Sequence, residues 1–152
     1  MSVKRSCVEP DLKYTLVGTA GGNDPDTGDI YRGLDRFGRV KDAYWRDYGA
    51  GADAARIQYG YDRASNRTWR ADPVAIANGA KLEELYAYDG LQRLTNLQRG
   101  QLNPGRTAIT SLSFAQCWTL DSTGNWQGLR KDDTGDGTWS ATHTTRDFRI
   151  AL

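Results

Sequence analysis

Four aspartates along this chain are each followed, four or five residues later, by a side chain that could pair with a carboxylate. In three copies this side chain is an arginine, which gives the pairs Asp35/Arg39, Asp62/Arg67 and Asp89/Arg93. A row of carboxylates and guanidinium groups could bind sugars or ions. Each pair could instead hold its own turn or a neighbouring hairpin, and exposed pairs of this kind contribute about 0–1 kcal/mol each. We favour the structural role because the pair returns in every well-formed copy; the fourth copy, at Asp121, has Asn125 and Trp126 in place of the arginine.

A second set of side chains that could contact a ligand is aromatic. It comprises Tyr59, Tyr61, Tyr86, Tyr88 and Trp118. Aromatic faces stack on sugar rings, so this series makes carbohydrate binding the alternative function. Large residues on one face of repeated strands more commonly pack one repeat against the next. We therefore expect packing to be their role, unless Tyr59, Tyr86 and Trp118 share a groove that a glycan can enter.

The segment Asp132–Gly137 resembles the start of a calcium-binding loop, with aspartates at the first and fifth positions and glycine at the sixth. The twelfth position is His143, where such a loop needs a bidentate glutamate, so a turn between strands is the better interpretation. His143 is the only histidine, and no spacing to a nucleophile or an acid makes it part of a catalytic triad. We predict no catalytic, cofactor-binding or metal-binding residues, no cofactor and no enzymatic activity.

The elements that position these residues repeat with the aspartates. The residues one and three positions before each aspartate point to the same side of a strand. The residues one position before are Leu34, Tyr61, Tyr88 and Leu120, and those three positions before are Arg32, Tyr59, Tyr86 and Trp118. Aspartate favours the start of a turn because its carboxylate accepts backbone N–H bonds just ahead. At the third position after it, Gly38 and Gly124 suit a left-handed backbone, whereas Ser65 and Gln92 would be slightly strained or adopt another turn type.

The aspartates are 27, 27 and 32 residues apart, and self-similarity at a near-constant period indicates a repeat architecture. Strand-like alternation recurs in each copy, and no window keeps a helical pattern over about 12 residues. We predict an all-β fold of consecutive antiparallel hairpins that form a curved or spiral repeat sheet. Residues 1–28 are predicted to be irregular apart from a short strand at 14–17, residues 29–131 to hold four repeats, and residues 132–152 to form a turn-rich, degenerate tail.

Composition limits the possible partners. The 152 residues include 20 basic and 19 acidic side chains, and a net charge of +1 gives no reason to expect binding to nucleic acid or to an anionic membrane. No stretch approaches the roughly 20 apolar residues of a membrane span, and the N-terminus lacks the apolar core of a signal peptide. Cys7 and Cys117 have no metal-binding spacing, although they could form a disulfide if the fold brings them together.

The pattern Tyr-x-Tyr-Asp-x-x-Gly-Arg/Asn-Arg resembles the tyrosine–aspartate (YD) repeat of Rhs proteins. The segments Tyr59–Thr68 and Tyr86–Leu94 match it best, and the resemblance covers about residues 29–139. The same repeat type occurs in teneurins, in bacterial wall-associated proteins and in the shell component of insecticidal toxin complexes. The resemblance implies a long strip of β-hairpins wound into a spiral shell, which encloses a toxic polypeptide or serves as a scaffold at the cell surface. Carbohydrate binding is also associated with these repeats.

We therefore predict a non-enzymatic structural repeat segment that contributes to a shell or surface scaffold. With about four copies and without the region that closes a full shell, the chain is interpreted as a fragment or remnant of a larger repeat protein. Its partners would be further repeats of that protein or, through exposed strand edges, other copies of itself. The compartment is left open, since only the resemblance implies a secreted or cell-surface parent. We expect the second and third copies to be sound, and the first, with Arg32, and the fourth, with Asn125 and Trp126, to fray or meet another partner.

Overall fold

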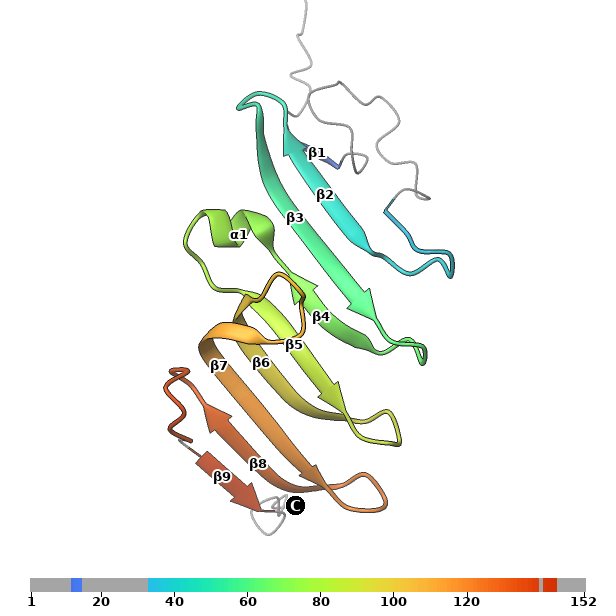
Figure 1. Ribbon diagram of the computed structural model, residues 1–152, viewed down its shortest axis with the longest axis vertical. Helices are drawn as coiled ribbons and strands as arrows, with labels where there is room; N and C mark the ends of the chain where they lie inside the picture. Colours follow the sequence, from blue (N-terminus) through green and yellow to red (C-terminus); the bar gives the residue numbers. More distant parts are fainter. Residues whose placement is uncertain (1–11, 15–32, 140, 145–152) are drawn as a thin grey trace, which may run out of the picture. The chain divides into compact units, whose positions relative to one another are not determined.

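The computed structural model describes residues 12–14, 33–139 and 141–144 (Figure 1). The chain forms two compact units, Met1–Ile57 and Gln58–Leu152. In chain order the strands are β1 (Leu12–Tyr14), β2 (Asp42–Asp47), β3 (Ala52–Tyr61), β4 (Arg67–Ala71), β5 (Glu83–Tyr88), β6 (Leu94–Leu102), β7 (Ile109–Leu120), β8 (Trp126–Asp132) and β9 (Ala141–Thr144). A short helix, α1 (Pro73–Ala77), lies between β4 and β5. β1 shares only Tyr14 with the strand expected at 14–17, and residues 15–17 lie outside the described part of the chain.

In the first unit, β1 pairs antiparallel with β2. Polar side chains join β2 to the beginning of β3: Arg46 forms an ion pair with Asp53 at 2.6 Å, and Arg56 forms one with Asp42 at 2.8 Å. Tyr44 on β2 is buried and donates its hydroxyl to the Asp53 carboxylate at 2.6 Å. Burial, together with this hydrogen bond, raises the pKa of the Tyr44 phenol. A small polar network around one buried tyrosine therefore holds the first unit's hairpin.

In the second unit, β3 to β9 form one antiparallel sheet in which each strand pairs with the next along the chain (Figure 1). Because successive side chains of a strand point to opposite faces, Tyr59 and Tyr61 on β3 point away from the face of Gln58 and Gly60, and all four residues are half-buried. The predicted fold class, all-β with consecutive antiparallel hairpins, is confirmed.

The helix α1 occupies the β4–β5 connection, for which the sequence indicated only Pro and Gly chain breakers. Asp72 caps it, since its carboxylate accepts the Ala75 N–H at 3.0 Å. Pro73 suits the first helical position because its missing N–H would have no partner there. Two local signals thus start the helix, and Gly79, with a φ of 80°, follows its end.

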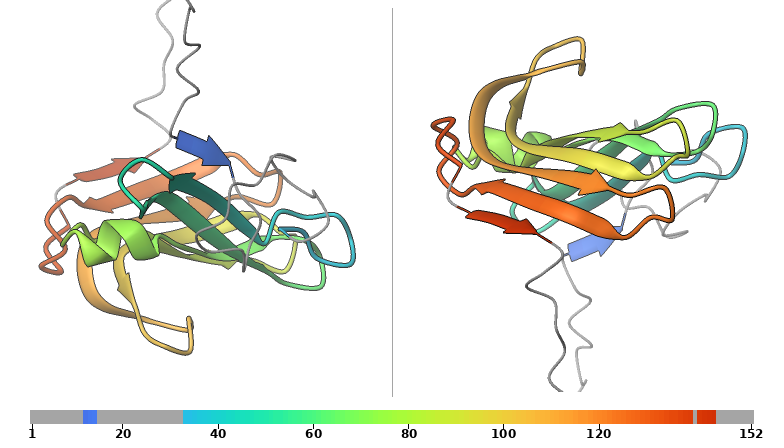
Figure 2. Two further views of the ribbon diagram at one scale, coloured as in Figure 1. Left: turned by 90° about the horizontal axis from the view of Figure 1, so that it is seen from above. Right: turned by 90° about the horizontal axis from the view of Figure 1, so that it is seen from below.

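The ends of β6 and β7 next to their connecting loop bend away from the rest of the sheet (Figure 2). The register of this pair shifts twice there, between Arg99 and Gly100 and between Gln101 and Leu102, and such bulges bend strands. Gly100 permits the close approach of the two strands, because a Cβ atom at this position would lie 2.1 Å from the Ser111 carbonyl oxygen.

Few apolar side chains are fully buried in the second unit. Among its described residues these are Ala71, Leu102 and Ala115. Most other strand residues are half-buried. Because a central core is nearly absent from the described part of this unit, its stability must depend strongly on contacts between neighbouring strands and turns.

Candidate functional site

The four turns that begin with the repeated aspartates share one backbone geometry. The N–H of each aspartate donates to the carbonyl four residues ahead, and its own carbonyl accepts the N–H three residues ahead. The residue at that third position has a left-handed backbone in every copy: φ is 75° at Gly38, 71° at Ser65, 64° at Gln92 and 94° at Gly124. This is a three-residue hairpin loop, a type I turn followed by a left-handed residue and a bulge. The predicted left-handed position is confirmed, and Ser65 and Gln92 adopt it without changing the turn type.

The aspartate carboxylate holds each turn through the residue four positions ahead. One carboxylate oxygen accepts that residue's backbone N–H, and the other accepts its side chain. The side-chain donors are Arg39 Nε at 2.7 Å, Asn66 Nδ2 at 2.8 Å, Arg93 Nε at 2.6 Å and Asn125 Nδ2 at 3.0 Å. The donor therefore alternates between arginine and asparagine along the chain.

The predicted pair Asp62/Arg67 is wrong in its partner. Asp62 accepts from Asn66, and the guanidinium of Arg67 lies over the Tyr59 ring, 4.3 Å from its centre. Arg67 is five residues after the aspartate, one too far to meet the carboxylate in this turn. Counting four residues from every aspartate would have identified the asparagines.

The fourth turn is as complete as the others, contrary to the expectation that it frays. Asn125 replaces the arginine at Asp121, and the Thr123 N–H and hydroxyl both donate to the same carboxylate, at 2.9 and 2.8 Å. The hydrogen bonds from the side chains of Thr123 and Asn125, with that from the Asn125 N–H, lower the pKa of Asp121 to about 2. The Arg93 N–H and guanidinium similarly lower the pKa of Asp89. These carboxylates act as charged acceptors within their own turns.

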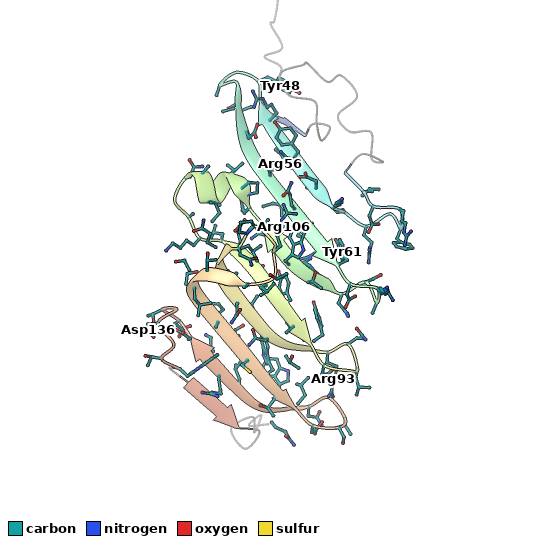
Figure 3. All side chains as sticks on the ribbon, viewed as in Figure 1. Tyr48, Arg56, Tyr61, Arg93, Arg106 and Asp136 are labelled. Carbon is teal, nitrogen blue, oxygen red and sulfur yellow. The ribbon has the colours of Figure 1, made fainter. Side chains whose placement is uncertain are left out.

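Consecutive turns of the second unit are also bonded to one another. We call residues 62–66, 89–93 and 121–125 the turn row; they lie at the same end of the sheet, at the β3–β4, β5–β6 and β7–β8 connections (Figure 1). Asn66 Nδ2 donates to Gln92 Oε1, which links the first of these turns to the second. Arg93, labelled in Figure 3, donates Nη1 to the Asp121 carbonyl at 2.7 Å, which links the second to the third. The same side chains that hold each turn thus join it to the next.

The strand register places aromatic and charged residues opposite one another on one face of the sheet. From β3 to β7, directly paired residues run Tyr59, Arg70, Glu84, Arg99 and Phe114. Arg99 forms an ion pair with Glu84 at 2.7 Å, and its guanidinium lies 5.5 Å from the centre of the Phe114 ring. These residues are all half-buried. Side chains from consecutive hairpins therefore pack against each other across this face.

The three aromatic residues proposed to contact glycans each contact a neighbouring side chain. Arg67 covers a face of Tyr59, the Tyr86 hydroxyl donates to Glu84, and the Trp118 and Trp126 rings lie 6.4 Å apart at 54°. Burial first, and then the Glu84 carboxylate, raises the pKa of Tyr86 to about 12. The hollow on the second unit that is described below is not lined by these rings. Carbohydrate binding on this face stays a prediction, and the contacts favour packing.

The segment Asp132–Gly137 is a turn between β8 and β9, as predicted. Asp132 is only 1% exposed, and its carboxylate accepts the N–H groups of Thr134 at 3.1 Å, Gly135 at 2.7 Å and Gly137 at 2.8 Å. Burial raises the pKa of Asp132, but these N–H groups outweigh it, so the pKa lies below its ordinary value. In the described ranges no three His, Cys, Asp or Glu side chains are grouped as metal ligands would be. Of the two cysteines, Cys117 is half-buried on β7 as a free thiol, and Cys7 lies outside the described residues.

The sheet of the second unit, together with the turn row, is an open array of β-hairpins joined by short polar turns. No protein-family model matches the chain, and no curated protein matches it significantly. A structure of the Tc holotoxin pore of Photorhabdus luminescens is similar to it, with a TM-score of 0.51 and 15% identical residues over 71% of this chain. The chain spans 6% of the length of that protein. At this identity the likeness establishes a shared fold. None of the helices described for this chain has the length and apolar character needed to cross a membrane.

Proposed function

We propose that this chain is a non-enzymatic, structural segment of β-hairpin repeats that forms part of the wall of a larger shell or scaffold. The turn row is the observation that carries the proposal. Each turn holds itself through an aspartate, and the first two turns bond the next one through Asn66 and Arg93. This arrangement can be repeated many times along a chain, because every hairpin is stabilised by contacts with its neighbouring hairpins.

The thin core supports the same proposal. Hairpins that bury few apolar side chains centrally gain their stability from adjacent hairpins, and an array of this type is stabilised by adding units at its ends. In the described part of the chain, β9 is the last strand of the sheet order, and the outer side of an edge strand offers unpaired N–H and C=O groups. The partners would therefore be further hairpins of a parent protein or the edge strands of another copy. The shared fold with a chain of a toxin assembly is consistent with such a wall.

The test is the association state of the full chain. Sedimentation velocity over a wide concentration range should show self-association that grows with concentration, and Thr142→Pro in β9 should reduce it because proline removes a backbone N–H and disfavours strand pairing. Thr142→Ala is the matched control and should associate as the unmodified chain does. A monodisperse monomer at all concentrations that unfolds in one sharp two-state transition would overturn the proposal.

A further inference from the structure

A hollow of about 390 Å³ lies beside α1 in the second unit. Its apolar lining comes from the end of β4, from α1, and from the end of β6 with the loop that follows: Ala71, Pro73, Ile76, Ala77, Leu102 and Pro104. Sites for small molecules commonly measure roughly 300–1,000 Å³ and combine apolar walls with a few polar groups. The volume of the hollow lies within this range, and its apolar walls, of which Pro73 and Ala77 are exposed, leave it open to solvent on one side.

Glu83 is the acidic group of this hollow. It begins β5, is 8% exposed, and accepts the Leu102 N–H through Oε2 at 2.7 Å. Among the described residues, its other oxygen, Oε1, accepts no hydrogen bond and pairs with no Lys or Arg, yet it is not one of the buried atoms left without a partner, so it is open to solvent at the hollow. A buried carboxylate is costly unless a cation or several donors compensate it. Glu83 therefore has capacity for one more donor.

The nearby basic side chains are bonded elsewhere. Arg106, labelled in Figure 3, also lines the hollow, but it donates Nη2 to Gln58 Oε1 at 2.7 Å and lies over the Trp69 ring, 4.1 Å from its centre. Lys81 donates Nζ to the Ser111 hydroxyl at 2.7 Å. A cation that pairs with Glu83 Oε1 would therefore come from outside these two side chains.

We propose that the hollow binds an alkylammonium group, whose charge pairs with Glu83 Oε1 and whose aliphatic chain lies against the apolar lining. The apolar walls favour an organic cation over a metal ion, which needs several oxygen ligands, and no group of three metal-ligating side chains occurs among the described residues. An ammonium ion donates charge-assisted hydrogen bonds to a carboxylate, which are stronger than neutral ones. The ligand is either a free alkylamine or the side chain of a lysine.

The test is a titration of the isotopically labelled full chain with pentylamine, followed by amide NMR. Pentylamine should produce saturable shifts at Glu83, Leu102 and Arg106, whereas 1-pentanol, of nearly the same shape and uncharged, should bind much more weakly. A second titration with Nα-acetyl-lysine methylamide distinguishes the two sources, since tighter binding than pentylamine identifies a lysine side chain and weaker binding identifies a free amine. Failure of both amines to produce saturable shifts, or equal binding of pentanol, overturns the proposal.

Two variants test whether binding of pentylamine depends on the charge of Glu83 and on the open volume of the hollow. Glu83→Gln retains an oxygen for the Leu102 N–H and should weaken pentylamine binding by roughly tenfold to a hundredfold. Glu84→Gln is the matched control, because Glu84 lies on the opposite face and pairs with Arg99; it should leave the affinity unchanged. Ala77→Leu adds volume to the lining without touching Glu83 and should also block binding, so the proposal is decided even if Glu83→Gln does not fold. Unchanged affinity for pentylamine in either Glu83→Gln or Ala77→Leu contradicts the proposed site, and so does the same loss of affinity in Glu84→Gln.

Self-association of the chain is a separate measurement, so the proposed binding site and the proposed structural role can fail independently.

Discussion

The two ends of the second unit's sheet are built differently. In the turn row, three connections have the same length and the same backbone, and in each the aspartate carboxylate accepts the backbone N–H and the side chain of the residue four positions ahead. At the other end the β4–β5, β6–β7 and β8–β9 connections each have their own structure, and each uses a different polar anchor: Asp72 caps α1, Asn103 accepts the Thr107 N–H at 2.8 Å, and Asp132 binds three N–H groups.

This difference separates two roles within one sheet. The uniform end joins hairpin to hairpin and can be extended, because the fourth residue after the aspartate, Asn66 or Arg93, donates to the next turn in both links. The variable end borders the open hollow beside α1, which is lined by the β4–β5 and β6–β7 connections. Substitutions at each end and changes of pH can show whether the two ends differ in this way.

The largest effect is expected at the variable end, from Gly100→Ala. The new methyl group would lie 2.1 Å from the Ser111 carbonyl oxygen, so β6 and β7 must separate, at a cost of about 2–4 kcal/mol in the free energy of unfolding. Gly90→Ala in the turn row is the control, since no atom lies within 4 Å of the added Cβ; it should change stability by less than about 0.5 kcal/mol. Urea unfolding measures both, and equal losses would contradict the difference.

Asp89→Ala should disturb two turns at once. It removes the acceptor for the Leu91 and Arg93 N–H groups and for the Arg93 guanidinium, which also bonds the Asp121 carbonyl. We expect the melting temperature to fall by roughly 2–5 °C, with faster hydrogen exchange in the turn at Asp121 as well as its own. Arg63→Ala, at an exposed position of the neighbouring turn, is the control. If hydrogen exchange in Asp89→Ala becomes faster only in residues 89–93, the two turns are not coupled.

Acid should weaken the turn row in a defined pH window. The pKa of Asp121 is lowered to about 2, so its contribution is complete above the unfolded value of about 3.9 and is lost as the pH falls from about 4 toward 2. The melting temperature of the unmodified chain should fall more steeply across this window than that of Asp121→Asn, which lacks the titrating group. Parallel curves for the two proteins would contradict this.

High pH should destabilise the sheet through Tyr86 on the strand face. The pKa of Tyr86 is raised to about 12 by burial and by Glu84, so the fold favours the neutral phenol. Its contribution is complete below the unfolded value of about 10 and is lost as the pH rises from about 10 toward 12. Tyr86→Phe should flatten the decrease of the melting temperature in this window, and an unchanged slope would show that Tyr86 is not the group responsible.

The smallest effects concern two residues with the same strained backbone. Ser65 in the turn row has a φ of 71°, and Arg106 at the variable end has a φ of 57°. Ser65→Gly should be neutral or stabilise the chain by up to about 1 kcal/mol, because glycine adopts this conformation without strain. Arg106→Gly relieves similar strain but removes the contacts to Gln58 and Trp69, so it should destabilise. Chemical unfolding of both variants tests this, and effects of the same sign would mean that the Arg106 contacts add little.

The sequence by itself determined the hairpins, the turn positions and the strand faces. Aspartate, a left-handed position three residues later and alternation before the turn are all local, so they can be read without knowing the fold. The partner of Asp62 is equally local: charge alone favours Arg67, but the four-residue spacing common to all the turns places Asn66 at the carboxylate.

Only the tertiary structure decided what surrounds the hollow and how the turns are joined. Gln58 and Arg106 are 48 residues apart, and Asn66 and Gln92 are 26 apart, so no local pattern brings either pair together. The register shifts in β6 and β7 and the N-cap of α1 set where Glu83, Leu102 and Arg106 meet. A bulge moves every later residue by one position relative to its partner strand. The alternation of apolar and polar residues along a single strand does not show where such a bulge lies.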